Sequence, residues 1–194
     1  MKSFYFFALV FLVACSSENK KVERQNEVSS NYEEVDLRDS VNKLSAVGSP
    51  EFEYGQTAAF INKKGDTIIP FNQYEHCFLD TFSCFTFVQD SKLDKDNIVG
   101  INRKGKVVFE AFLFDNGPDY LSEGLFRIIR NGKIGFANKY GQIVVPAIYS
   151  CAYPFEDGKA KVTLKCETVK DEMEHSTWKS EKWFYIDKNG KKLN

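Results

Sequence analysis

The sequence predicts an all-β protein built from tandem antiparallel β-hairpin repeats. Four short segments repeat around a glycine, apolar residues alternate with polar ones in the stretches beside them, and no long stretch between them has helical spacing. Aromatic residues are abundant, with 18 Phe and 9 Tyr, which suits the cores of thin β layers.

The first residues of the chain have the pattern of an export signal. Lys2 supplies a positive charge, residues 4–13 form an unbroken apolar run, and Ala14-Cys15 follows. The run is too short to cross a bilayer, which takes about 20 residues, but it has the length of a signal-peptide core. A small residue followed by Cys resembles the lipobox of bacterial lipoproteins. The resemblance implies a signal peptide over residues 1–14 and lipidation of Cys15, and several acyl chains there would anchor the protein stably in a membrane.

The same resemblance implies a location in the bacterial cell envelope. Ser16 and Ser17 follow Cys15 with no Asp beside it, which by the sorting habit of lipoproteins predicts the outer membrane. The alternative is an ordinary signal peptide with an incidental cysteine.

A polar tether is expected after the anchor, over residues 15–50. Residues 16–34 are rich in Ser, Glu, Asn and Lys, and they bury too little apolar surface to offset chain entropy, so we expect a disordered spacer. Helical spacing then allows a short helix near residues 36–47 that docks on the domain. The apolar residues that set this spacing are Leu37, Val41 and Leu44.

The repeated segment consists of an apolar pair or near-pair, Asn or Asp, a basic residue, any residue and Gly. Asn or Asp at the first position of a turn bonds its side chain to the following amides, and Gly at the fourth position accepts positive φ. An apolar pair follows in the first three copies, so each of these units reads as strand, tight turn, strand. The predicted turn residues are Asn62 and Gly65, Asn102 and Gly105, Asn138 and Gly141, and Asp187 and Gly190.

A second pattern links the copies. Residues 121–128 match residues 155–162 in having an apolar anchor, a polar pair, Gly and an alternating strand. Asn131-Gly132 is a strong signal for a two-residue hairpin between residues 125–130 and 133–138. The strands are therefore expected to follow one another as meanders.

Residues 124–149, read in order, resemble one WG repeat, and Phe155 and Gly158 open the next. Ile134-Gly135 stands in place of the family's Trp-Gly pair, and Trp183-Phe184 keeps only the Trp. The family has no single activity, so the resemblance supports a fold more than a function. A repeat of this kind cannot bury its apolar face alone, so neighbouring copies must stack. The resemblance implies a WG-like repeat domain over residues 51–194, with copies near 55–90, 96–128, 131–165 and 182–194.

No residues in the sequence assemble a catalytic or metal site, so we expect no enzyme, no metal and no cofactor. The two histidines, His76 and His175, stand apart, and no second cysteine pair at zinc-ligand spacing accompanies Cys77 and Cys84. Acidic residues gather in the charged insertion 167–182, where mixed acids and lysines indicate a solvated loop or hairpin tip.

Four cysteines remain unlipidated in the mature chain. An even number in an oxidising compartment permits two disulfides, and three pairings are open. Buried free thiols are equally compatible with the sequence, because Cys packs as a small hydrophobe. The four are Cys77, Cys84, Cys151 and Cys166.

The sequence predicts a membrane-anchored envelope lipoprotein whose repeat domain is a binding module for a protein, a peptide or a glycan. Charge is balanced, with 26 basic and 27 acidic residues, and no basic stripe interleaves with aromatics, so no nucleic-acid partner is expected. Residues shared by the copies are structural, so function should lie in the connectors, 167–182 among them. Two alternatives stay open: a hydrolase acting on cell-wall or glycan material, and a purely structural envelope component.

Overall fold

The computed structural model describes residues 32–38, 41–48, 58–90, 98–170 and 176–193, and every regular element among them is a β-strand. The strands pair antiparallel, which confirms the predicted all-β repeat class. The expectations for the signal peptide, for Cys15 and for His175 concern residues outside the described ranges.

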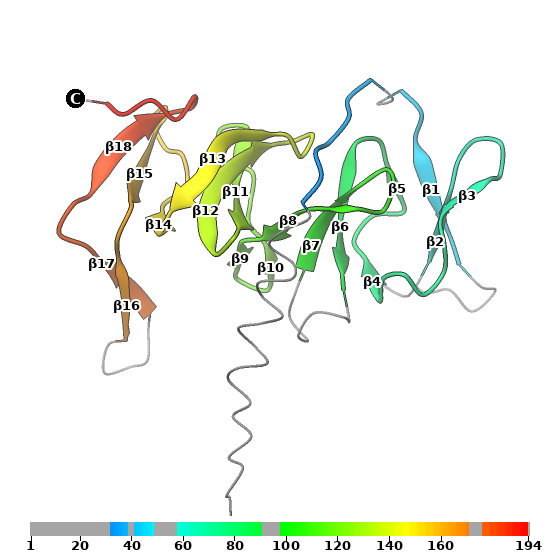
Figure 1. The fold of residues 1–194 in the computed structure, drawn as a ribbon, viewed down its shortest axis with the longest axis horizontal. Helices are drawn as coiled ribbons and strands as arrows, with labels where there is room; N and C mark the ends of the chain where they lie inside the picture. The colour runs from blue at the N-terminus through cyan, green and yellow to red at the C-terminus, as the bar shows by residue number, and fades with distance from the viewer. Residues whose placement is uncertain (1–31, 39–40, 49–57, 91–97, 171–175, 194) are drawn as a thin grey trace, which may run out of the picture.

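The strands form four successive units, shown side by side in chain order in Figure 1. Units 1 to 3 are three-stranded meanders, and in unit 4 a single bridge between Ile186 and Lys192 takes the place of the third strand. Unit 1 contains β1 (Leu44–Val47), β2 (Ala59–Ile61) and β3 (Thr67–Ile69). Unit 2 contains β6 (Phe85–Gln89), β7 (Ile98–Asn102) and β8 (Val107–Ala111). Unit 3 contains β11 (Leu125–Arg130), β12 (Lys133–Asn138) and β13 (Ile143–Tyr149), and unit 4 pairs β15 (Lys159–Thr163) with β18 (Phe184–Asp187).

Units 2 and 3 share one seven-stranded sheet, in the order β13-β12-β11-β8-β7-β6-β4. Pairing of Ile128 with Ala111 and of Ile129 with Glu110 joins the two units. With one added strand each, unit 1 forms the sheet β3-β2-β1-β5 and unit 4 forms the sheet β14-β15-β18. The added strands of these three sheets are β4 (His76–Cys77), β5 (Thr81–Phe82) and β14 (Cys151–Ala152). Two small hairpins stand apart from them. One pairs β9 (Leu113–Phe114) with β10 (Gly117–Pro118), and the other pairs β16 (Glu167–Lys170) with β17 (Ser176–Lys179).

The hydrophobic core is divided into three clusters, and each one spans a boundary between units. Leu44 and Phe60 of unit 1 pack with Ile101 of unit 2. In the second cluster Phe109 of unit 2 packs with Phe126 of unit 3, their ring centroids 5.9 Å apart. The third joins residues of units 3 and 4, including Phe136, Val162 and Ile186. No unit therefore buries its apolar face alone, as the repeat pattern predicts.

The described residues between 36 and 47 form no helix, and that expectation is wrong. Leu44–Val47 is strand β1, which pairs with β2 from Ser45 opposite Ile61 to Val47 opposite Ala59. Leu44 is fully buried, whereas Val41, which the helix would have placed on the same face, is 81 % exposed. Pairing with β2 completes the meander of unit 1, and this long-range gain outweighs the local helical spacing.

Part of the expected tether also belongs to the folded domain, which therefore begins before residue 51. Residues 32–38, here called the strap, lie against units 2 and 3. The Glu33 amide donates a hydrogen bond to the Val107 carbonyl oxygen at 2.9 Å. Val35 is buried in the same cluster as Phe109 and Phe126. The polar composition of this stretch gave no indication that Val35 would be buried or that the Glu33 backbone would bond to unit 2.

Candidate functional site

Unit 4 differs from the other units in how its first two strands are connected. In unit 3 the turn Asn131-Gly132 makes this connection, and both residues have positive φ, 52° and 66°. In unit 4 the chain takes residues 164–183 to pass from β15 to β18. Part of this insertion folds as the hairpin β16–β17, with Glu167 opposite Lys179 and Lys170 opposite Ser176. The described part of the connector that the sequence analysis marked as charged and variable thus contains a pair of β-strands.

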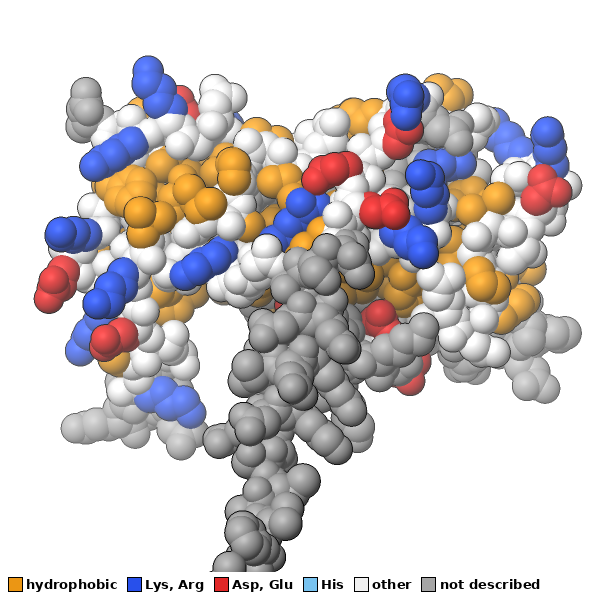
Figure 2. Space-filling view, in the orientation of Figure 1, with side chains coloured by type: hydrophobic (Ala, Val, Ile, Leu, Met, Phe, Trp, Pro, Cys, Tyr) orange, Lys and Arg blue, Asp and Glu red, His pale blue; other side chains and the backbone are white. Residues whose placement is uncertain are grey.

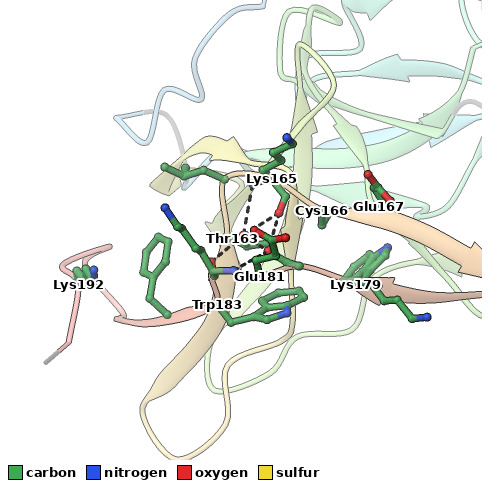
Figure 3. Close-up of a pocket in the computed structure, with 13 residues that line it drawn as sticks. Thr163, Lys165, Cys166, Glu167, Lys179, Glu181, Trp183 and Lys192 are labelled. Carbon is green, nitrogen blue, oxygen red and sulfur yellow. Dashed lines mark hydrogen bonds between the residues drawn. The ribbon is translucent and has the colours of Figure 1, made fainter.

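A groove of about 910 Å³ lies where this hairpin leaves the sheet of unit 4 (Figure 3). Three aromatic side chains line it, those of Trp178, Trp183 and Phe184. Charged side chains surround them: Lys165, Lys179, Lys182, Lys192, Glu167 and Glu181. Four lysines against two glutamates give the groove a positive surplus.

A network of hydroxyl groups holds the base of the groove. Thr163 is 1 % exposed, and its Oγ1 lies 2.9 Å from both Ser180 Oγ and the Lys182 carbonyl oxygen. Ser180 Oγ donates a hydrogen bond to the Lys165 carbonyl oxygen at 2.6 Å. These contacts, drawn as dashed lines in Figure 3, hold the exit from β15 against the entry to β18. Contacts within the protein therefore hold the base of the groove in shape.

A disulfide attaches the start of the hairpin to the rest of unit 4. Cys151 in β14 is bonded to Cys166, with 6.2 Å between the Cα atoms. Of the pairings that the sequence left open, the structure contains this one, while Cys77 and Cys84 are buried thiols. Burial raises the pKa of both thiols, so their reactive thiolate forms are disfavoured.

The outer side of the β15–β18 sheet carries rings and cations in alternation, which we call the aromatic–lysine face. Ala160 and Val162 point inward, so the alternate residues Lys159 and Lys161 point outward. Lys161 Nζ lies 5.1 Å from the centroid of the Trp183 ring. The face comprises Lys159, Lys161 and Tyr185 of the paired strands, together with the neighbouring rings of Tyr153, Trp178 and Trp183. Figure 2 shows hydrophobic side chains gathered over β15 and β18 with basic side chains around them.

The groove and the face meet at the two tryptophans. The Tyr153 ring contacts those of Trp178 and Trp183, each at 5.4 Å between centroids. In the linear sequence no basic stripe interleaves with aromatic residues, yet the pairing of β15 with β18 creates one locally. Side chains at alternate positions of paired strands share a face, whatever their separation along the chain.

From Trp178, ring contacts continue through Phe112 to a buried ion pair that the sequence analysis did not predict. Trp178 contacts Phe112 at 6.1 Å between ring centroids, and the Arg127 guanidinium lies 4.0 Å from the Phe112 centroid. Arg127 Nη2 is 2.6 Å from Asp119 Oδ1, and both side chains are nearly fully buried. The two opposite charges neutralise each other, and the ion pair holds the segment just after β10 against β11. An Arg within the apolar strand Leu125–Arg130 was its one signal in the sequence.

The predicted turn residues have the same geometry in all four copies. The side-chain oxygen of the Asn or Asp accepts hydrogen bonds from the amides two and four residues later, over 2.8–3.2 Å. The glycines have φ between 67° and 87°. The pairs are Asn62 and Gly65, Asn102 and Gly105, Asn138 and Gly141, and Asp187 and Gly190. These residues form the scaffold and lie apart from the groove.

Gly135 occupies the position of the glycine in the Trp-Gly pair, and it has a steric role. A Cβ there would lie 2.7 Å from both the Ala147 nitrogen and the Val145 oxygen, which are backbone atoms of β13. The pairing of β12 with β13 is irregular at this point, and it brings the two backbones together. Only glycine leaves room for this approach.

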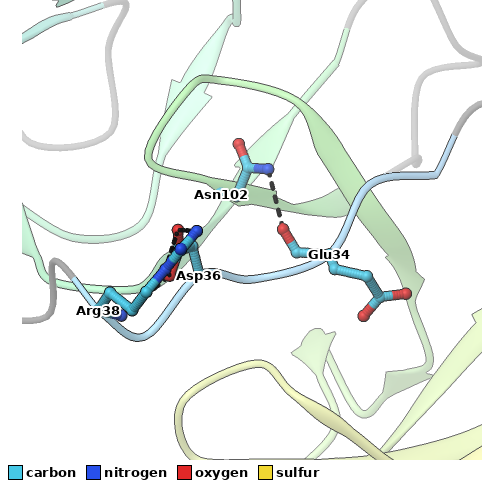
Figure 4. A network of polar contacts seen from close by, with 4 residues as sticks. All are labelled: Glu34, Asp36, Arg38 and Asn102. Atoms are coloured by element: carbon cyan, nitrogen blue, oxygen red, sulfur yellow. Dashed lines mark hydrogen bonds and ion pairs between the residues drawn. The ribbon is translucent and has the colours of Figure 1, made fainter.

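Asn102 combines its turn role with a contact to the strap (Figure 4). Its Nδ2 donates a hydrogen bond to the Glu34 carbonyl oxygen at 3.2 Å. Next to it Asp36 and Arg38 form an exposed ion pair at 2.7 Å, and bonding to Arg38 lowers the pKa of Asp36 to about 2. The contact links the strap to the second repeat turn.

Within the ranges that the structure describes, no three His, Cys, Asp or Glu side chains gather as a metal-binding group. His76 packs edge-on against Phe78, with 4.8 Å between the ring centroids. Those same ranges contain no helix of the length and apolarity needed to span a membrane.

Comparison with known protein families gives a match to the family described as WG containing repeat. Its model matches residues 101–133 and 134–165. No curated protein matches the chain. No solved structure matches it either. The matched segments run from the end of β7 to just beyond β15, so both tryptophans and the hairpin β16–β17 lie outside them. Residues 101–165 thus carry two WG-containing repeats.

Proposed function

We propose that the protein is an anchored envelope lipoprotein whose β-repeat domain is a binding module, with the groove and the aromatic–lysine face of unit 4 as its binding site. One observation carries this proposal. Residues common to the repeats form turns and core, whereas the insertion between β15 and β18 builds a groove lined by tryptophan.

The exposure of the aromatic side chains favours binding over a purely structural role. Tyr153 and Tyr185 are 41 % and 44 % exposed on the same sheet face. A contiguous apolar patch rimmed by polar groups typically marks an interaction site. A component without a ligand would gain nothing from keeping these rings in water.

The chemistry of the groove favours binding over hydrolysis. Its two carboxylates, Glu167 and Glu181, are both exposed to solvent. A carboxyl group that acts as a general acid near neutral pH is usually desolvated by its surroundings. The groove thus offers recognition groups in place of an acid and base pair.

The anchor rests on the sequence signal at the chain start. Lys2, the apolar run over residues 4–13 and Ala14-Cys15 place lipidation at Cys15, with the outer membrane as the expected location. Residues 15–32 reach at most roughly 60 Å when fully extended. A ligand of unit 4 would therefore belong to the envelope near that membrane.

The proposal is tested by retention on isolated envelopes. The full chain with Cys15→Ser separates ligand binding from lipid anchoring. Trp178→Ala with Trp183→Ala should abolish its retention. Tyr140→Ala is the matched control, because Tyr140 is 44 % exposed and has Lys139 Nζ 5.0 Å from its ring but lies outside the groove. Equal retention of the double variant and the control would refute the site, provided that both unfold at the same temperature.

A further inference from the structure

Resting on the proposed function, we infer that the ligand of unit 4 is an acidic polysaccharide, a chain of sugar rings that carry anionic substituents. The groove and the aromatic–lysine face would hold it together, with rings against the tryptophans and anionic groups at the lysines. Each part of this assignment follows from a separate feature of the site.

The aromatic side chains provide flat apolar surfaces next to polar groups. Trp178 and Trp183 are both partly exposed, and Tyr153 bridges them at 5.4 Å to each ring. The C–H bonds on the face of a sugar ring are attracted to the negative face of an indole. Rings joined into a chain can occupy successive aromatic side chains along this row.

The cations select an anionic ligand. Lys165, Lys179, Lys182 and Lys192 line the groove, and Lys159 and Lys161 lie on the adjoining face. Ammonium groups form charge-assisted hydrogen bonds to carboxylate, sulfate or phosphate oxygens. A neutral polysaccharide would leave these bonds unused.

The two carboxylates argue for a glycan over a nucleic acid. Glu167 and Glu181 lie among the lysines of the groove. A carboxylate accepts hydrogen bonds from sugar hydroxyls, which every ring of a glycan offers. A nucleic acid strand carries a negative charge at every nucleotide, and these carboxylates would repel it.

The β18 edge of unit 4 argues against a peptide that binds there as an added strand. Residues 191–193 cover the free side of β18: the Asp187 amide donates to the Lys191 carbonyl oxygen at 2.9 Å, and the Leu193 amide donates to the Tyr185 carbonyl oxygen at 2.8 Å. Peptides that extend a sheet need such an edge unpaired. A ligand therefore meets side chains here, not backbone.

Intrinsic tryptophan fluorescence can monitor binding at this site, because the only two tryptophans of the sequence both line the groove. Tryptophan fluorescence of the full chain with Cys15→Ser is titrated with polygalacturonate, dextran and an oligothymidylate. We expect saturable binding of polygalacturonate alone. The binding should weaken strongly at about 1 M salt, where the Debye length is about 3 Å.

Matched variants separate the two parts of the site. By calorimetry, Trp183→Ala should weaken polygalacturonate binding about tenfold or more, as truncation of an anchoring aromatic does. Lys161→Gln should weaken it by up to about fivefold, which corresponds to the interaction energy of an exposed ion pair. Lys63→Gln, in the exposed turn of unit 1, should leave it unchanged.

Three results would overturn the inference. Equal affinity for dextran would remove the role of the anionic groups, and tighter binding of the oligothymidylate would assign the site to nucleic acid. Failure to bind polygalacturonate, while the double tryptophan variant still loses envelope retention, would refute the polysaccharide and leave the binding module in place. Failure in both assays would refute the proposed function itself.

Discussion

Gly65 and Gly141 occupy the same place in two of the four turns, yet their surroundings differ. Both have positive φ, 87° and 80°. A Cβ at Gly65 would meet nothing within 4 Å, whereas one at Gly141 would lie 2.6 Å from the Phe85 ring of unit 2. A residue with a purely local role in one repeat thus forms a contact between units in another.

This difference predicts unequal effects of one substitution. Gly65→Ala should lower the free energy of unfolding by about 1–2 kcal/mol, the cost of a left-handed backbone with a Cβ. Gly141→Ala should cost about 1–3 kcal/mol more, because the Phe85 ring must move. Urea unfolding of both variants measures the difference. Equal destabilisation would show that the Phe85 contact carries no energy.

Arg127 and Asp119 represent another kind of residue-scale constraint, a buried pair of opposite charges. Asp119→Ala should destabilise the fold by about 3–5 kcal/mol, because it leaves the Arg127 guanidinium buried without its partner. Adding Arg127→Met should restore part of that loss. Urea unfolding of the single and double variants tests this, and a double variant no more stable than the single one would contradict it.

At the scale of elements, the strap shows how a short segment without regular structure is held in place. Arg130 reaches it from β11: its Nη2 donates to the Glu33 carbonyl oxygen at 2.9 Å, and its guanidinium lies 5.1 Å from the Tyr32 ring. The Tyr32 hydroxyl donates to the Glu110 carboxylate. Backbone, charge and ring contacts together attach the end of the tether to the junction of units 2 and 3.

The strap contact should depend on pH in the alkaline range. Burial, followed by the hydrogen bond to Glu110, raises the pKa of Tyr32 well above its usual value of about 10. A raised pKa means that the contribution of this hydroxyl is fully present below pH 10. The contribution is lost as pH rises above 10, because the unfolded state then ionises first.

Comparison with Tyr32→Phe isolates this effect from the other tyrosines. The difference in unfolding free energy between the parent chain and the variant should be constant from about pH 7 to 9 and shrink above about pH 10. Tyr140→Phe, at an exposed position, is the control variant measured over the same pH range. A difference that stays level through pH 11 would exclude ionisation of Tyr32 as the cause.

At the scale of the whole molecule, the units form one continuous array, because each core cluster belongs to two neighbours. The strap enters near the middle of this array, and the groove of unit 4 lies toward one end (Figure 1). In the proposed function, this arrangement holds the groove away from the point where the tether joins the folded domain.

The anchor is a prediction about the molecule as a whole. Cys15→Ser should abolish labelling with radioactive palmitate and move the protein from the membrane fraction to the soluble fraction, since it removes the atom that is lipidated. Cys77→Ser, at a buried cysteine, serves as the control and should keep the label. A labelled Cys15→Ser chain would refute the lipobox.

Interactions between residues close in the chain could be predicted from the sequence. The four Asn- or Asp-led turns and the Asn131-Gly132 hairpin depend on bonds within a few residues, so their geometry is written in short motifs. The all-β class follows from the alternation between such turns. The stacking of units follows because each hairpin has an apolar face that it cannot cover alone.

Features that depend on partners far along the chain were decided by tertiary structure alone. Leu44–Val47 had helical spacing but became a strand, because β2 offered it a paired edge and a buried place for Leu44. The Cys151–Cys166 bond and the aromatic–lysine face likewise arise where strands bring distant residues together. Short motifs determine turns, whereas the choice of strand partners is a property of the whole fold, and the groove that we propose as the binding site follows from that choice.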